Sequence, residues 1–162
     1  MSQLVITDNS LTTEEKYKNL LPQIASLVQK EDNFISSLAN VTAALKQTFD
    51  KISWVGFYLF DGKKLYLGPF QGKVACANIE IGKGVCGKSA ELKRSIVVPN
   101  VNEFPGHIFC DADSKSEIVI PLLKETNVLG VLDVDSTEYN SFNEIDELYL
   151  TEICNKLVKV IF

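Results

Sequence analysis

No stretch of the sequence approaches the roughly 20 consecutive apolar residues of a membrane-spanning helix. Residues 1–20 carry acidic side chains where a signal peptide needs an apolar core. Positive charge is also scarce, since 16 Lys and Arg face 21 Asp and Glu for a net charge of −5, whereas nucleic acids and anionic membranes bind basic surfaces. We therefore expect a cytoplasmic protein with no nucleic-acid partner and no membrane partner.

The four cysteines form no C-x-x-C pair, so the sequence lacks the usual signature of a structural zinc site. No metal and no other cofactor is expected. In a reducing cytoplasm thiols stay free at rest, so a disulfide among these cysteines would be catalytic or redox-sensing rather than structural. The four positions are Cys76, Cys86, Cys110 and Cys154.

Low-complexity tracts, internal repeats and linker-like segments are all missing from the sequence. A hydrophobic content of 46% over 162 residues is enough to bury a core without metal or disulfide support. We expect a short polar tail at residues 1–12 and one domain at residues 13–162.

Apolar residues at helical spacing open and close this domain. They run through residues 17–28, where Pro22 should kink the helix or mark its first turn. A second helix begins at about Phe34. The last helix follows Asn143, a good N-cap residue.

Between these helices the sequence is typical of strands. The run "ISWVGFYLFDGKKLYLGPF" predicts a hairpin turning at Asp61-Gly62, and "EIVIPLLKETNVLGVLDVDS" predicts a second one turning at about Thr126-Asn127. "KVACANIEI" and "SIVVPN" predict two more strands, with a short helix entered through "GKGVCGKSAELKR" between them and a long loop at 100–116 after them. The order ααβββαβββα favours an antiparallel α+β sandwich over a doubly wound fold.

Strand alternation gathers acidic and aromatic side chains on one face of the sheet. Side chains along a strand point to opposite faces in turn, so Asp133 and Asp135 share a face with Leu129 and Val131. Pairing about the second turn brings Glu117 to the end of the sheet that holds Asp135. The pocket predicted in this way is formed by Trp54, Tyr58, Glu117, Asp133 and Asp135.

Two interpretations of the three acids remain open. Most Asp and Glu side chains are solvated, and strand ends are an ordinary place for them. Carboxylates clustered in a partly closed site instead need a cation or shared protons, because like charges raise one another's pKa. An ammonium group over an aromatic face would meet that need.

The cysteines differ in their surroundings. Cys110 lies in the polar loop "HIFCDADSKS", where a structural cysteine gains little by burial, which favours a functional role. Cys86 lies where a helix begins, a place that lowers a thiol pKa, although a small residue in a tight turn explains it equally well. Cys154 adjoins the apolar stripe of the last helix and is predicted to be a packing residue. His107 is only a weak match to a Cys-His nucleophile pair.

From about Phe34 to the C-terminus, the blocks "WVGFYL", "LGPFQGKVAC", "GKGVCGKSA", "FPGHIFCDADSKSEIVIPL" and "GVLDVDS" occur in order. In these blocks the chain resembles the free methionine-(R)-sulfoxide reductases, stand-alone catalytic members of the GAF-domain superfamily. Phe109 stands where that family commonly has alanine. The resemblance implies an α+β, GAF-like fold: a central antiparallel six-stranded sheet flanked by helices.

The resemblance also implies roles. Cys110 matches the family's attacking cysteine, and Cys76 and Cys86 match its two candidate resolving cysteines. The expected reaction reduces free L-methionine-(R)-sulfoxide to L-methionine, with a sulfenic acid, an intramolecular disulfide and recycling by thioredoxin. The alternative is a non-catalytic GAF module that binds a small ligand or senses redox state. A homodimer is a possible assembly. The family's substrate-pocket positions correspond here to Trp54, Tyr58, Glu117, Asp133 and Asp135.

Overall fold

A computed structural model of the chain describes residues 8–162, so most of the predicted polar tail lies outside the described residues. Six strands form one antiparallel sheet in the order β3-β2-β1-β6-β5-β4. The predicted order of elements and the predicted six-stranded α+β sheet are confirmed. The elements are α1 (Thr13–Leu27), α2 (Phe34–Thr48), β1 (Trp54–Phe60), β2 (Lys64–Gln71), β3 (Asn78–Glu80), α3 (Gly84–Leu92), β4 (Ile96–Val98), the 3₁₀ turn η1 (Val101–Glu103), β5 (Ser116–Lys124), β6 (Asn127–Ser136) and α4 (Glu144–Ile161).

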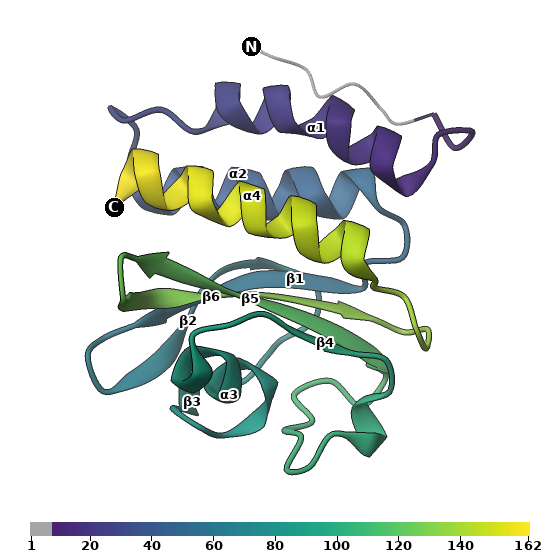
Figure 1. Cartoon of the computed structure of the whole chain (residues 1–162), viewed down its shortest axis with the longest axis vertical. Helices are drawn as coiled ribbons and strands as arrows, with labels where there is room; N and C mark the ends of the chain where they lie inside the picture. Colours follow the sequence, from purple (N-terminus) through teal and green to yellow (C-terminus); the bar gives the residue numbers. More distant parts are fainter. Residues whose placement is uncertain (1–7) are drawn as a thin grey trace.

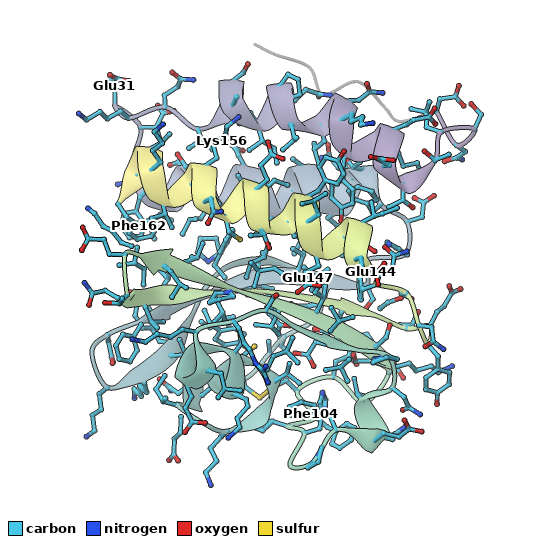
Figure 2. All side chains as sticks on the ribbon, in the orientation of Figure 1. Glu31, Phe104, Glu144, Glu147, Lys156 and Phe162 are labelled. Carbon is cyan, nitrogen blue, oxygen red and sulfur yellow. A yellow bond between two sulfur atoms is a disulfide. The ribbon has the colours of Figure 1, made fainter. Side chains whose placement is uncertain are left out.

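The helices cover the two faces of the sheet unequally (Figure 1). α2 and α4 lie on one face with α1 outside them, and α3 lies on the other. Each face buries its own cluster of apolar side chains, which fill the space on both sides of the sheet in Figure 2. No helix among residues 8–162 has the length and apolar character needed to cross a membrane.

Polar caps set the starts of the main helices. Thr12 and Glu15 form a reciprocal capping box at α1, and Asn143 forms the expected cap of α4 together with Asp146. Pro22 lies inside α1, so it does not mark the first turn of that helix.

The buried Asp146 carboxylate joins three elements. It accepts hydrogen bonds from the Tyr17 hydroxyl at 2.8 Å and from Lys51 Nζ at 2.8 and 2.9 Å. Because its side chain is fully buried, these contacts and the cap supply the partners that a buried charge requires.

The first hairpin turns at Asp61-Gly62 as predicted, with Asp61 Oδ1 accepting from the next backbone amides and Gly62 at a φ of +93°. The second hairpin turns at Glu125-Thr126, one residue earlier than predicted, because Lys124 pairs with Asn127. Of the predicted strand "KVACANIEI", only β3 pairs with a neighbouring strand.

Leu129, which was predicted on the pocket face of the sheet, lies on the opposite face. Leu122 pairs with Gly130 and Leu123 pairs with Val128, which leaves Leu129 as the extra residue of a β-bulge. The bulge reverses the alternation, so Leu129 packs against the helix-covered cluster while Val128 packs on the α3 side. The predicted placement of Leu129 was therefore wrong.

Candidate active site

A cavity lies between the sheet and α3. Strands β1, β5 and β6 form its floor, α3 forms one wall, and the loop between η1 and β5 covers it. Seven of the eight predicted site residues line it, and the eighth, Cys76, is bonded to one of them. The cavity-lining residues with polar, thiol or aromatic ring groups are Trp54, Tyr58, Lys83, Cys86, His107, Cys110, Asp111, Ser114, Glu117, Asp133 and Asp135.

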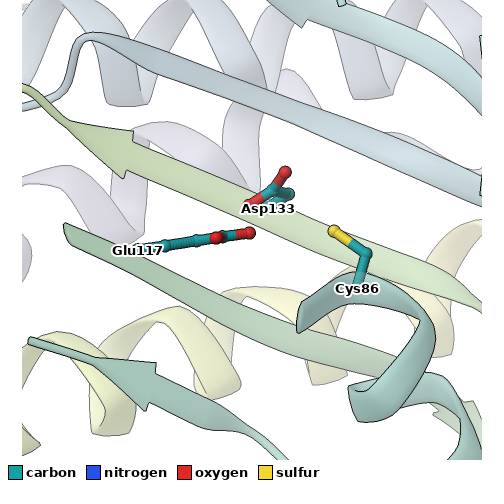
Figure 3. Close-up of side chains that lie close together, drawn as sticks. All are labelled: Cys86, Glu117 and Asp133. Carbon is teal, nitrogen blue, oxygen red and sulfur yellow. The ribbon is translucent and has the colours of Figure 1, made fainter. Parts of the chain in front are cut away.

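Sheet register brings the three predicted acids together. Glu117 pairs with Asp135, and Val119, on the same face as Glu117, pairs with Asp133. Glu117 is 5% exposed and Asp133 is 7% exposed, so the interpretation of these two acids as solvated strand ends was wrong. Figure 3 shows the Glu117 and Asp133 side chains close together and next to Cys86 of α3.

Burial raises the pKa of all three acids well above the ordinary range, and the charge of the neighbouring acids raises it further. Ser114 Oγ donates to Asp135 Oδ1 at 2.7 Å, which partly opposes the increase for Asp135. Asp133 Oδ1 is buried and has no hydrogen-bond partner among the described residues. The cluster therefore suits a positively charged donor or shared protons.

Aromatic rings form the wall beside the acids. Trp54 stacks between Tyr58 and Phe70, with ring centroids 6.0 and 5.4 Å away. A Cβ at Gly56 would collide with the Trp54 ring, so glycine is required there. The Trp54 indole N–H donates to the Lys73 carbonyl at 2.9 Å, which fixes the ring against the segment leading to β3.

The two cysteines on the cavity rim are joined by a disulfide. Cys76 lies before β3, Cys110 lies in the covering loop, and their Cα atoms are 5.5 Å apart. The Tyr58 hydroxyl donates to the Cys76 carbonyl at 3.0 Å, so the aromatic wall also positions this cysteine. Lys73 forms ion pairs with Asp111 and Asp113 across the same two segments.

Cys86 is a free thiol inside the cavity rather than on its rim. Burial, followed by the nearby charge of Asp133 and Glu117, raises the pKa of the Cys86 thiol well above its usual value. Desolvation therefore outweighs the lowering of the thiol pKa that was expected at the helix N-terminus. Cys154 is fully buried in the helix-covered cluster and remains free, in agreement with a packing role.

Cys86 Sγ and one carboxyl oxygen each from Glu117 and Asp133 lie within 4.8 Å of one another. Among residues 8–162, this is the one group of such side chains compact enough to surround a metal ion. A metal ion would have to displace protons from three groups whose pKa is raised. An ammonium group needs only carboxylate acceptors, so it fits this cluster better than a metal ion does.

Two further site residues were not predicted. His107 Nε2 lies 2.9 Å from Glu117 Oε2, so the histidine pairs with an acid and not with Cys110. Its place in "FPGHIFCDADS" was a signal too weak to identify that partner. Ser114 contacts Asp135 through a loop conformation that no sequence pattern indicated.

An antiparallel sheet flanked by helices, with a closed acidic and aromatic cavity on one face, defines an α+β domain built to enclose a small molecule. Residues 36–161 match the family model of the GAF domain, and the chain belongs to this family.

Relatives of high similarity within this family include named enzymes. The chain is 42% identical over 147 residues to the free methionine-R-sulfoxide reductase of Escherichia coli, covering 91% of this chain and 89% of that protein. It is 57% identical over 145 residues to the GAF domain-containing protein A of Dictyostelium discoideum, covering 89% and 91%. The free methionine-R-sulfoxide reductase of Neisseria meningitidis, solved in complex with its substrate, superposes with a TM-score of 0.91 at 41% identity, covering 97% and 95%.

Proposed function

We propose that the protein reduces free L-methionine-(R)-sulfoxide to L-methionine in the cytoplasm. The observation that carries this proposal is the Cys76–Cys110 disulfide at the rim of a cavity that holds three acids with raised pKa values. Named reductases among the relatives support the same chemistry.

The cavity explains selection of a free amino acid. The substrate ammonium group lies against the cluster of Glu117, Asp133 and Asp135, where Asp133 Oδ1, which lacks a partner of its own, accepts a hydrogen bond from it. A methionine sulfoxide within a peptide has an amide in place of that ammonium group, so it would leave the acid cluster unneutralised. Trp54 and Tyr58 pack against the side chain that carries the sulfoxide.

Cys110 performs the chemical step. Its thiolate attacks the sulfoxide sulfur while an acid protonates the sulfoxide oxygen, a role that suits a carboxyl group held neutral by burial. The products are methionine and a sulfenic acid on Cys110. The sulfenic acid then condenses with a second thiol, releasing water and forming a disulfide.

Cys76 is the preferred resolving cysteine because it is already bonded to Cys110 in the structure. Cys86 lies deeper, and its raised thiol pKa makes it the slower nucleophile. Thioredoxin would open the Cys76–Cys110 disulfide from the rim. The thiolate of the reductant attacks one sulfur of this disulfide and forms a mixed disulfide. The second thiol of the reductant then displaces the bound cysteine, which leaves Cys76 and Cys110 reduced and the reductant oxidised.

Separated sulfoxide epimers test the proposal. Purified protein with dithiothreitol, and separately with thioredoxin and its reducing system, should release methionine from the R epimer and spare the S epimer. Equal rates on both epimers, or a preference for a peptide-bound sulfoxide, would contradict the assignment. Binding of the sulfoxide without release of methionine would instead indicate a sensor module.

A further inference from the structure

His107 occupies a place in the cavity that thiol chemistry alone does not explain. Its Nε2 lies 2.9 Å from Glu117 Oε2, and the two side chains are 6% and 7% exposed. The ring packs edge-on against Phe109, with centroids 4.5 Å apart, and the His107 backbone N–H donates to the Phe104 carbonyl. The imidazole is thus held between a carboxyl group and an aromatic ring.

The second ring nitrogen of His107 has no partner of its own. His107 Nδ1 is buried and has no hydrogen-bond partner among residues 8–162, and the side chain lines the cavity. Only three buried side-chain atoms of the described residues lack a partner, and the cavity-lining His107 and Asp133 carry two of them. Buried polar atoms are nearly always paired, so two unpaired atoms in one cavity indicate contacts reserved for a bound molecule.

Burial acts in opposite directions on the two members of the pair. It raises the pKa of Glu117 and lowers that of His107, so both groups are favoured in their neutral forms. In that arrangement the Glu117 carboxyl O–H donates to Nε2, and the imidazole carries its own proton on Nδ1. A ligand oxygen in the cavity can accept that Nδ1 proton.

We propose that His107 and Glu117 act together as the acid that protonates the sulfoxide oxygen, an inference that rests on the proposed reductase function. As the Cys110 thiolate bonds to the sulfoxide sulfur, the oxygen takes the Nδ1 proton of His107. Nε2 takes the proton of Glu117 at the same time, which leaves a Glu117 carboxylate.

The step balances in atoms and electrons. The sulfur–oxygen bond breaks as the hydroxyl group passes to Cys110, so the substrate sulfur gains two electrons and Cys110 loses two. Methionine and the sulfenic acid are the products. Cys110 released one proton when it formed its thiolate, and Glu117 takes up one proton after turnover.

The contacts of the three acids assign a different role to each carboxyl group. Glu117 is already engaged by His107, and Asp135 is engaged by Ser114. Asp133 is left with an open oxygen for the ammonium group. Proton delivery and ammonium binding are thereby assigned to different carboxyl groups of one cluster.

Methionine binding and sulfoxide reduction separate these roles experimentally. Methionine carries the same ammonium and carboxylate groups but no sulfoxide oxygen, so its affinity reports on binding without proton delivery. His107→Gln keeps an amide near the Nε2 position, and His107→Asn keeps one near the Nδ1 position. Neither amide can pass a proton from Glu117 to substrate.

Both variants should lower the single-turnover rate of methionine release from the R-sulfoxide by roughly 10²–10⁴-fold, the usual size of general-acid catalysis. Methionine affinity, measured by calorimetry on reduced protein, should change by no more than about threefold. Glu103→Gln is the control, because Glu103 is exposed in η1 and is not among the residues that line the cavity; its rate should stay within about threefold of wild type.

Two results would overturn the inference. One is a His107→Gln rate within about threefold of wild type, and the other is a loss of methionine affinity as large as the loss of rate, which would show a purely structural role. His107→Ala with added imidazole is a second check, since restored turnover requires a proton carrier in the vacated space. The wild-type protein is measured first, so failure of the reductase function itself would be seen before any variant is compared.

Discussion

Asparagine in place of Asp133 is expected to stabilise the fold and to weaken the enzyme. The Asp133 side chain is buried beside two other acids, and its Oδ1 has no hydrogen-bond partner among the described residues. An amide of the same shape removes the buried charge and can donate to a neighbouring carboxyl oxygen. In the proposed complex, the same change would deprive the substrate ammonium group of its acceptor.

The expected magnitudes follow from one gain in stability and one loss of substrate binding. Relieving an unsatisfied buried group contributes about 1–3 kcal/mol. At roughly 2–4 °C per kcal/mol for a domain of this size, Asp133→Asn should raise Tm by roughly 2–12 °C. Truncating one partner of a buried charge pair costs about 2–5 kcal/mol, which corresponds to a fall in kcat/KM of roughly 30-fold to 4,000-fold.

The stability gain should depend on pH with a definite sign. Burial raises the pKa of Asp133 above the 3.8 of an unperturbed aspartate. A raised folded-state pKa means that the wild type carries no penalty below about pH 4 and loses stability as the pH rises through the raised value. The Tm difference between variant and wild type should therefore be smaller at about pH 4 than at about pH 8.5.

Thermal unfolding at those two pH values, together with dithiothreitol-driven kcat/KM, measures both effects. Asp50→Asn is the control, because Asp50 is exposed and is not among the residues that line the cavity. An Asp133→Asn protein that is less stable than wild type at about pH 8.5, or that keeps kcat/KM within about threefold, would refute this account of the acid cluster.

Further predictions concern the thiols and the buried ion pair. Cys76→Ser should release close to one methionine per enzyme without reductant and then stop with a sulfenic acid on Cys110, detectable by mass spectrometry. Cys86→Ser should still form the Cys76–Cys110 disulfide, and a variant that fails to do so would reassign the resolving cysteine. Cys154→Ser should leave kcat/KM within about threefold, because its sulfur packs only against the helix-covered cluster. Asp146→Asn should lower Tm by roughly 6–20 °C, the effect of about 3–5 kcal/mol for a broken buried pair, while the rate per folded molecule is unchanged.

The sequence was most informative where local rules decide the structure. Period-two alternation correctly placed Trp54 and Tyr58 on the face that carries Glu117, because the sheet buries one face against α3 and the other against helices. Asn143 and the Asp61-Gly62 turn were found for the same reason, since a cap or a tight turn is defined by a few neighbouring residues.

Predictions failed where a tertiary contact or an irregularity intervenes. The bulge at Leu129 has no sequence signature, yet it reverses the alternation of one strand. Cys86 begins a helix, which would lower its pKa, but three-dimensional packing buries it among acids and reverses the sign. The pairing of His107 with Glu117 depends on the path of a long loop, which residue patterns do not determine.

The two cysteine-bearing segments are held by the same side chains that form the cavity. On one side, Tyr58 and Trp54 donate to the Cys76 and Lys73 carbonyls, while on the other, His107 and Ser114 in the Cys110 loop contact Glu117 and Asp135. Opening the disulfide removes one link between these segments and leaves four hydrogen bonds to the sheet. We therefore expect the reduced Cys110 thiol to stay close to the acids, and the Cys76 thiol to stay close enough to capture the sulfenic acid of the proposed reaction. In the proposed reaction, positioning by the sheet rather than by the disulfide itself would allow the disulfide to form and open in each cycle without disrupting the substrate site.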